Sequence, residues 1–142
     1  MSSITPFLWF DTQAEEAAKF YCSVFGNSRI TGTTPGPGGR PMTVGFELDG
    51  QEFVALNGGP QFRFNEATSF VIHCRDQDEI DHYWSKLTGD GGEESMCGWL
   101  KDKYGLSWQV VPKGLGEMLS SPAAVQAMMK MRKFDIAALK AA

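Results

Sequence analysis

The stretch that decides the fold is GWLKDKYGLSWQVVP, residues 98–112, and its pattern is that of a β-hairpin. It divides into a strand, a turn and a return strand, at residues 99–101, 102–105 and 106–111. Asp and Gly are common at the ends of such turns, because Asp hydrogen-bonds nearby backbone and Gly tolerates positive φ. Side chains alternate along a strand, so Gln109 shares a face with Ser107 and Val111. Gln109 is a polar residue on a largely apolar strand, so it is the first candidate for a functional role.

Length and composition indicate one folded domain of ordinary size. The chain has 142 residues, of which 42% are hydrophobic and 21% are charged, which is enough to bury a core. The formal net charge is −4, and no block of Lys or Arg is present. This balance argues against nucleic acid or an anionic membrane as a partner.

The cysteines and the apolar runs indicate the compartment. Cys22, Cys74 and Cys97 are odd in number, widely spaced and form no CxxC pair, so reduced thiols fit best. No apolar run reaches the length of a membrane span, and the N-terminus lacks a charged-then-apolar signal. We therefore expect a cytoplasmic protein.

The first half of the chain predicts one helix among four strands. The strands are expected at residues 4–10, 28–34, 42–48 and 51–56, and the helix at residues 14–25. Asp11 or Thr12 offers the N-cap of the helix, and Asp49-Gly50 is a strong signal for a tight hairpin turn. The Gly- and Pro-rich connection at residues 35–41 leads into no helix, which excludes a phosphate-binding loop.

The second half predicts the same order of elements, followed by a helical tail. A strand at residues 69–75 precedes a helix at residues 77–88, for which Asp76 is the expected N-cap. A short strand at residues 93–97 then leads into the hairpin. The tail predicts short helices, at residues 115–120, 123–131 and 136–142.

The two halves share one plan, strand-helix-strand-strand-strand, although their sequences differ. Neither half has enough core alone, so we predict a single α+β domain, residues 1–142, made of paired βαβββ modules. The modules are expected to form a curved, half-open mixed sheet with the helices outside and a concave pocket inside. The expected boundaries are residues 4–60 and 66–113 for the modules and 114–142 for the tail.

Several motifs resemble one protein family. They are TPFLWFD at residues 5–11, AEEA at 14–17, FY at 20–21, LNGGP at 56–60, CGWLKD and YGLSWQ within 97–109, and MMKMRKFDI at 128–136. With the repeated plan, they resemble the PhnB-like branch of the vicinal oxygen chelate superfamily. This branch is also named for a 3-demethylubiquinone-9 3-methyltransferase domain, and the superfamily for the glyoxalase/bleomycin-resistance/dioxygenase fold. The resemblance covers nearly the whole chain.

The resemblance also implies where a metal would bind. Metal-using members of the superfamily hold one divalent ion with His, Glu or Gln from the first and last strands of each module. The corresponding positions here are Thr5 (or Pro6), Asn57, Ser69 and Gln109, none of which is His, Asp or Glu. No anionic or imidazole ligand is offered, so we expect no metal site and no cofactor.

The cavity predicted from this fold has both polar and aromatic candidates. The expected ligand-binding residues are Thr5, Phe7, Trp9, Asn57, Ser69, His73, Trp99 and Gln109. Each has a plainer alternative. Gln109 can satisfy a backbone group, Asn57 can serve a turn before two glycines, and the aromatic residues can belong to the core. His73 can transfer protons or simply pack, and alternation places it on the face opposite Cys74, so the two form no nucleophile-base pair.

Four functions remain open from the sequence. The first is binding of a small molecule in a metal-free cavity, with no reaction assigned. The second is a metal-dependent lyase, isomerase or dioxygenase with ligands such as His73 and Gln109. The third is the methyltransferase that the family name implies, although no strand-GxGxG-helix signature is present. The fourth is a non-catalytic dimeric module whose cavity its own side chains fill.

The tail predicts a homodimer. It carries a series of apolar side chains that one small sheet does not obviously need, namely Met118, Met128, Met129, Met131, Phe134 and Ile136. Because methionine adapts to irregular surfaces, such a tail suits a helix that clasps a second copy of the chain.

Overall fold

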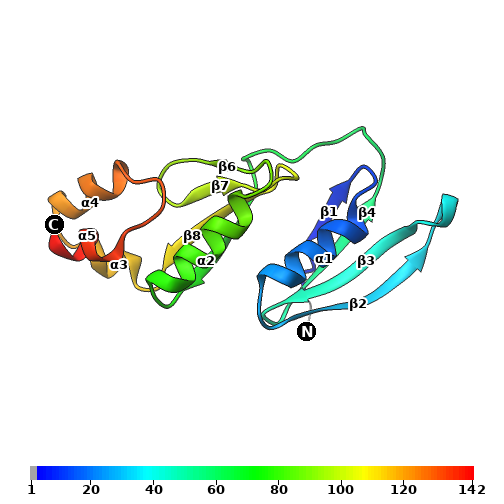
Figure 1. The fold of residues 1–142 in the computed structure, drawn as a ribbon, viewed down its shortest axis with the longest axis horizontal. Coiled ribbons are helices and arrows are strands. Elements are labelled where there is room, and N and C mark those ends of the chain that lie inside the picture. The colour runs from blue at the N-terminus through cyan, green and yellow to red at the C-terminus, as the bar shows by residue number, and fades with distance from the viewer. Residues whose placement is uncertain (1–2) are drawn as a thin grey trace. The chain divides into compact units, whose positions relative to one another are not determined.

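The computed structural model describes residues 3–142, and its chain divides into two units, Met1–Arg63 and Phe64–Ala142. The first unit contains β1 (Phe7–Phe10), α1 (Ala14–Val24), β2 (Ser28–Pro35), the short helix η1 (Pro37–Gly39), β3 (Pro41–Leu48) and β4 (Gln51–Asn57). Its strand order is β1-β4-β3-β2, with β1 parallel to β4 and the other neighbours antiparallel (Figure 1).

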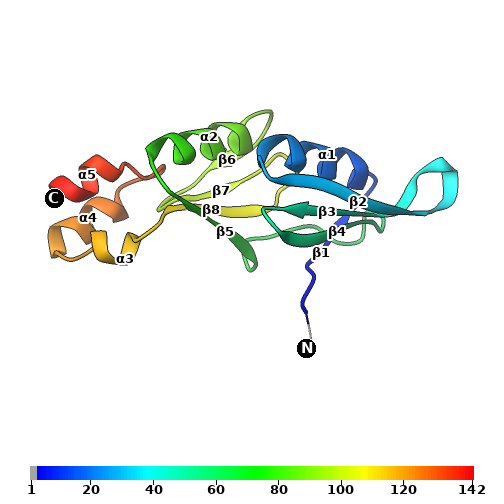
Figure 2. The same ribbon diagram turned by 90° about the horizontal axis from the view of Figure 1, so that it is seen from below.

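The second unit repeats this plan. It contains β5 (Ser69–Cys74), α2 (Gln77–Thr88), β6 (Glu93–Glu94), β7 (Trp99–Lys101) and β8 (Ser107–Pro112), followed by α3 (Leu115–Met118), α4 (Pro122–Met129) and α5 (Ile136–Ala141). Its strand order, β5-β8-β7-β6, corresponds to that of the first sheet strand for strand. Both sheets are mixed and open, and each carries its helix on one face (Figure 2). The predicted α+β class and the two βαβββ modules are therefore confirmed.

Helix α1 covers the first sheet because alternate strand residues present apolar side chains to it. On β3, Val44, Phe46 and Leu48 are buried, whereas the residues between them are not. The Tyr21 ring of α1 stacks on Phe46 at 5.9 Å, and Phe46 stacks on Phe53 of β4 at 5.3 Å. The hairpin turn between these strands lies at Asp49-Gly50, as predicted, with φ of 51° and 84°.

Two local expectations were wrong at the start of the chain. The first strand begins at Phe7 rather than at residue 4, and Ile4 is 88% exposed. Pro6 has no N–H to give to a ladder, although its carbonyl still accepts from Val54 N at 3.0 Å. Neither Asp11 nor Thr12 caps α1, because the side chain of Asn57 accepts the hydrogen bond from Ala14 N instead.

Another expected strand is shorter than the sequence predicted. The strand predicted at residues 93–97 is limited to Glu93–Glu94. Beyond it the chain turns, and both Cys97 and Gly98 adopt left-handed backbone, with φ of 57° and 81°. A strand needs negative φ, so these two residues end the pairing before β7 begins. By contrast, Asp76 caps α2 as predicted, accepting from Glu79 N at 2.9 Å.

The hairpin of β7 and β8 is organised by Asp102, whose side chain is buried although it is a carboxylic acid. Its Oδ1 accepts from Tyr104 N at 2.9 Å and from Leu106 N at 3.1 Å. Its Oδ2 accepts from the indole Nε1 of Trp108 at 2.9 Å. Because one side chain satisfies the turn and the return strand together, it sets the register in which the two strands pair.

The C-terminal tail packs on its own unit. Phe134 and Leu139 are buried there, while Met129 at the end of α4 stays 61% exposed. Backbone hydrogen bonds join the tail to the turn before β7, from Cys97 N to Met131 O and from Gly98 N to Arg132 O, both 2.8 Å. None of the helices among residues 3–142 is long and apolar enough to cross a membrane.

We expect Asp102→Ala to lower the free energy of unfolding by about 3 kcal/mol, because it leaves two buried N–H donors and one partly buried N–H donor without their acceptor. Asp102→Asn keeps one acceptor oxygen and should cost less. The matched control is Asp90→Asn at an exposed turn position, which should change stability by under about 0.5 kcal/mol. Urea unfolding measures all three. Equal midpoints for Asp102→Ala and the control would show that Asp102 does not hold the hairpin.

Candidate functional site

Four of the residues predicted from the sequence lie on one face of the second sheet, opposite α2. We call this surface the Gln109 face. The strand register arranges its residues in rows that run across β7, β8 and β5. The first row is Lys101–Ser107–Ser69 and the second is Trp99–Gln109–Val71. The third row has residues of β8 and β5 alone, Val111–His73. The intervening residues, such as Trp108 and Val110, are buried on the α2 side. The strands thus present one apolar and one largely polar surface.

The centre of the Gln109 face offers hydrogen-bonding groups beside an aromatic ring. Gln109 Nε2 donates to Ser69 Oγ at 3.0 Å, and its Oε1 accepts from none of the residues that the structure describes. Trp99, the cross-strand partner of Gln109, is half-buried. His73 is exposed, two residues from Val71 on the same side of β5. Such groups can orient a small molecule by one amide, one hydroxyl and one indole ring.

Sequence reasoning did not single out the outer row of this face. Lys101 forms an ion pair with Glu66, whose hydrogen bond raises the pKa of Lys101 and lowers that of Glu66. Glu93 is the cross-strand partner of Lys101, so a second carboxylate lies beside the same ammonium. Ser107 is 1% exposed, and its Oγ has no hydrogen-bond partner in residues 3–142. Strand alternation from Gln109 was the available signal for Ser107.

The first unit uses its aromatic candidates differently. Phe7 and Trp9 share the face of β1 opposite α1, and Phe7 is 63% exposed. The Trp9 indole donates to Gly59 O at 2.8 Å and meets Phe62 edge to face at 4.9 Å. The loop after β4 therefore folds back onto Trp9. Gly58 is required there, because an added Cβ would lie 2.4 Å from the Trp9 ring.

Asn57 does not join Phe7 and Trp9 on that face. Asn57 lies on the same face of β4 as the buried Phe53 and Ala55, and so points to the α1 side. Its Oδ1 accepts from Ala14 N at 2.9 Å, and its Nδ2 donates to Pro41 O at 2.9 Å. The side chain thus joins the start of α1 to the start of β3. Thr5 precedes β1 and is half-buried.

The donor set at the positions implied by the superfamily does not fit a divalent ion. In the first unit, the amide of Asn57 is already bonded at both ends, and Thr5 offers only a hydroxyl. In the second unit, Ser69 and Gln109 are neutral and bonded to each other. Divalent metals prefer imidazole, thiolate or carboxylate ligands. Within residues 3–142, no three His, Cys, Asp or Glu side chains gather as a metal site would require.

Cys22 and Cys74 do not provide a nucleophile on the Gln109 face. Burial raises the pKa of the Cys74 thiol to about 12, with a smaller contribution from the carboxylates of Glu79 and Asp76. Burial also raises the pKa of Cys22. Since the thiolate is the reactive form, both thiols stay protonated near neutral pH. Cys74 lies on the α2 side of β5, opposite His73.

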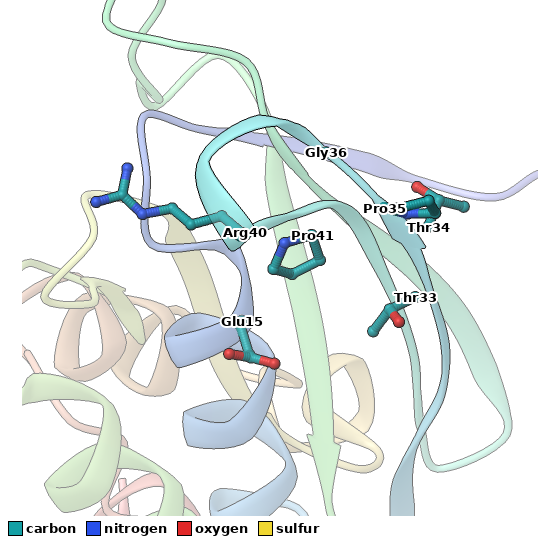
Figure 3. Close-up of a pocket in the computed structure, with 8 residues that line it drawn as sticks. Glu15, Thr33, Thr34, Pro35, Gly36, Arg40 and Pro41 are labelled. Carbon is teal, nitrogen blue, oxygen red and sulfur yellow. The ribbon is translucent and has the colours of Figure 1, made fainter.

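A separate open pocket of about 340 Å³ lies in the first unit, between the start of α1 and the tip of the β2–β3 hairpin (Figure 3). Glu15 and Arg40 supply its charged groups, and Thr33 lines it from β2. None of the residues predicted for the site lines it. Its walls are exposed hairpin and helix residues, without a buried polar group directed into it.

The chain is similar to one family model and to several solved structures. Residues 2–111 match the family model described as 3-demethylubiquinone-9 3-methyltransferase. The PhnB protein from Bacillus cereus is 34% identical, with a TM-score of 0.72 over 78% of this chain and 99% of that protein. A protein from Pseudomonas aeruginosa is 17% identical, with a TM-score of 0.66 over 79% and 98% of the two chains. The fosfomycin resistance protein FosX from Listeria monocytogenes is 14% identical, with a TM-score of 0.62 over 84% and 98%. No curated protein matches.

Replacing Asn57 tests whether it is a structural residue. We expect Asn57→Ala to lower the free energy of unfolding by about 1–2 kcal/mol, the usual cost of losing a helix cap. Asn57→Asp keeps the acceptor for Ala14 N and should cost less. Asn27→Ala, at an exposed position after α1, is the control. An Asn57→Ala protein that unfolds at the same urea concentration as the control would contradict the capping role.

Proposed function

The chain belongs to the 3-demethylubiquinone-9 3-methyltransferase family, the PhnB-like branch of the glyoxalase/bleomycin-resistance fold, and we propose that it binds a small molecule through neutral groups without a divalent metal. The binding surface in this proposal is the Gln109 face of the second unit. The observation that carries it is the Gln109–Ser69 hydrogen bond beside Trp99. It leaves the Gln109 carbonyl oxygen available as an acceptor.

The contrast between the two units supports this location. In the first unit, the polar groups of Trp9 and Asn57 are bonded within the unit. In the second unit, His73 is exposed and Trp99 is half-buried with an indole N–H that donates to no described residue. Unused polar groups next to an aromatic surface are what orients a small organic ligand.

Two alternative functions are a metal-dependent enzyme and a methyltransferase, and the experiment below distinguishes both from metal-free binding. A metal-dependent enzyme of the superfamily would need His73 and Gln109 as ligands, with a third donor from outside the Gln109 face. A methyltransferase would need to bind S-adenosylmethionine, and β1 leads into α1 through Asp11, Thr12 and Gln13 rather than a glycine-rich turn. For this reason we propose binding first and assign no bond-making step.

Untagged protein treated with EDTA, then incubated with nickel, zinc, manganese or iron(II) and desalted, should retain well below one metal ion per chain. A thermal-shift screen of small organic molecules on the EDTA-treated protein should yield stabilising ligands. Gln109→Ala should lower the affinity for these ligands about tenfold, as expected for loss of a ligand hydrogen bond. Gln51→Ala is the control, because Gln51 is exposed on β4 and its side chain, among residues 3–142, bonds only to Glu52 O.

Three results would contradict the proposal. Stoichiometric metal would make the metal-dependent reaction the working hypothesis. Stabilisation by S-adenosylmethionine alone would favour the methyltransferase. Equal ligand affinity for Gln109→Ala and the control would move the binding site elsewhere.

We also propose that the two modules act as one domain in a cytoplasmic homodimer. Support comes from the large apolar side chains that remain exposed, including Met129 on the tail. Sedimentation at micromolar concentration should give the mass of two chains, and Met129→Glu should favour the monomer. Gln126→Glu, on the same helix, is the matched control. Monomer at all concentrations, or equal dimerisation of both variants, would contradict a dimer that forms through the tail.

A further inference from the structure

We propose that the C-terminal tail is a positioning element for the ligand site, and that Gln77 and Phe134 hold Trp99 in place through Gly98. This inference rests on the proposed function, because it assigns a task to residues that adjoin the Gln109 face. It concerns a part of the chain beyond the family model, which ends at residue 111. The Bacillus cereus protein is matched over 99% of its own length by 78% of this chain.

The tail reaches the hairpin through the turn that precedes β7. The N–H groups of Cys97 and Gly98 donate to the carbonyls of Met131 and Arg132, each at 2.8 Å. Both donors have positive φ, a backbone conformation that is uncommon for a residue such as Cys97. The tail therefore stabilises a turn conformation that the local sequence does not favour. Trp99 is the next residue along the chain.

Phe134 adds a side-chain contact between the tail and Gly98. The ring is buried, and a Cβ added at Gly98 would lie 2.5 Å from it and 2.8 Å from Val110 O. Only glycine leaves room for the ring. Gly98 O in turn accepts from Val110 N at 2.8 Å, directly beside Gln109. A change in the position of Phe134 would therefore affect both β7 and β8, the strands that carry the site.

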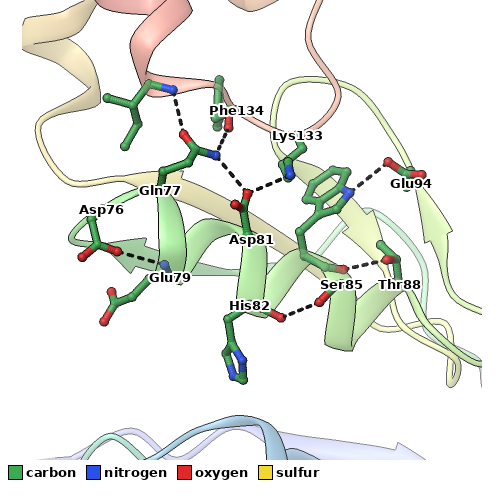
Figure 4. A network of polar contacts seen from close by, with 12 residues as sticks. Asp76, Gln77, Glu79, Asp81, His82, Ser85, Thr88, Glu94, Lys133 and Phe134 are labelled. Atoms are coloured by element: carbon green, nitrogen blue, oxygen red, sulfur yellow. Dashed lines mark hydrogen bonds and ion pairs between the residues drawn. The ribbon is translucent and has the colours of Figure 1, made fainter.

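Gln77, at the start of α2, fixes the tail at Phe134 and at Ile136 (Figure 4). Its Nε2 donates to Phe134 O at 2.9 Å and to Asp81 Oδ1 at 3.1 Å. Its Oε1 accepts from Ile136 N at 2.9 Å. Lys133 adds an ion pair to Asp81 at 2.7 Å. One amide side chain therefore satisfies three partners, and its removal releases the tail at a defined point.

Local support of this kind determines how well a binding residue is preorganised. A tail released at Gln77 leaves the Gly98 turn without its external acceptors, and Trp99 then samples more orientations. The expected consequence is a loss of ligand affinity that exceeds what the loss of stability explains.

The test compares Gln77→Ala with Asp76→Ala in the full-length protein. Both substitutions weaken the start of α2, but Asp76 caps the helix without contacting the tail. The first readout is the ¹H–¹⁵N signal of the Trp99 indole, assigned with Trp99→Phe. The second is the affinity for a ligand from the thermal-shift screen. We expect Gln77→Ala to move the Trp99 signal and to weaken the ligand about tenfold, while Asp76→Ala changes neither.

A milder second variant, Phe134→Leu, should shift the same signal while keeping the site buried. The inference is overturned if Gln77→Ala and Phe134→Leu leave the Trp99 signal unchanged, or if Asp76→Ala moves it as far. The Trp99 signal needs no ligand, so a screen without ligands would overturn the proposed function and leave this measurement to decide the inference. Conversely, a ligand that Gln109→Ala weakens, but that binds equally to Gln77→Ala, Phe134→Leu and Asp76→Ala, would support the function and overturn the role of the tail.

Discussion

The second unit depends on one buried carboxylate. Asp102 is 2% exposed, and it satisfies two backbone N–H groups of its own turn and the indole of Trp108. A buried charge is costly unless hydrogen bonds compensate it, so this arrangement tolerates little variation in geometry. Because Asp102 sets the register of β7 and β8, it also determines that Trp99 pairs with Gln109. A register shift of one residue would turn every side chain of β8 to the opposite face.

The two units share one plan but differ in the sheet face that lies opposite the helix. In both, the helix side of the sheet is apolar and closely packed, as for Phe46 in the first unit and Trp108 in the second. The opposite faces differ in the use of their polar groups. The Trp9 indole is bonded to its own loop, whereas Gln109 is bonded to Ser69 and its side-chain carbonyl oxygen accepts from no residue within 3–142. In the function proposed above, the second unit therefore carries the binding surface.

Local patterns predicted most of the fold, and long-range contacts account for what they missed. The β7–β8 hairpin and the Asp76 cap depend on residues within a few positions of one another, so turn and capping rules sufficed. The capping of Ala14 by Asn57 joins residues 43 positions apart, and the bond from Gln77 to Phe134 joins residues 57 positions apart. No periodicity in one sequence indicates such pairs. For the candidate site, alternation predicted the strand face on which Gln109 lies, but it could not indicate that the amide of Asn57 would bond to the start of α1.

The most direct test of the account compares the two side-chain amides of Asn57 and Gln109 by NMR. Protein in EDTA is titrated with a ligand from the screen, and the ¹H–¹⁵N signals of both NH₂ groups are followed. The account predicts that the Gln109 signals shift with saturation while those of Asn57 stay in place, since Asn57 is bonded to α1 and β3. Shifts at Asn57 without shifts at Gln109, or binding that disappears in EDTA, would contradict it.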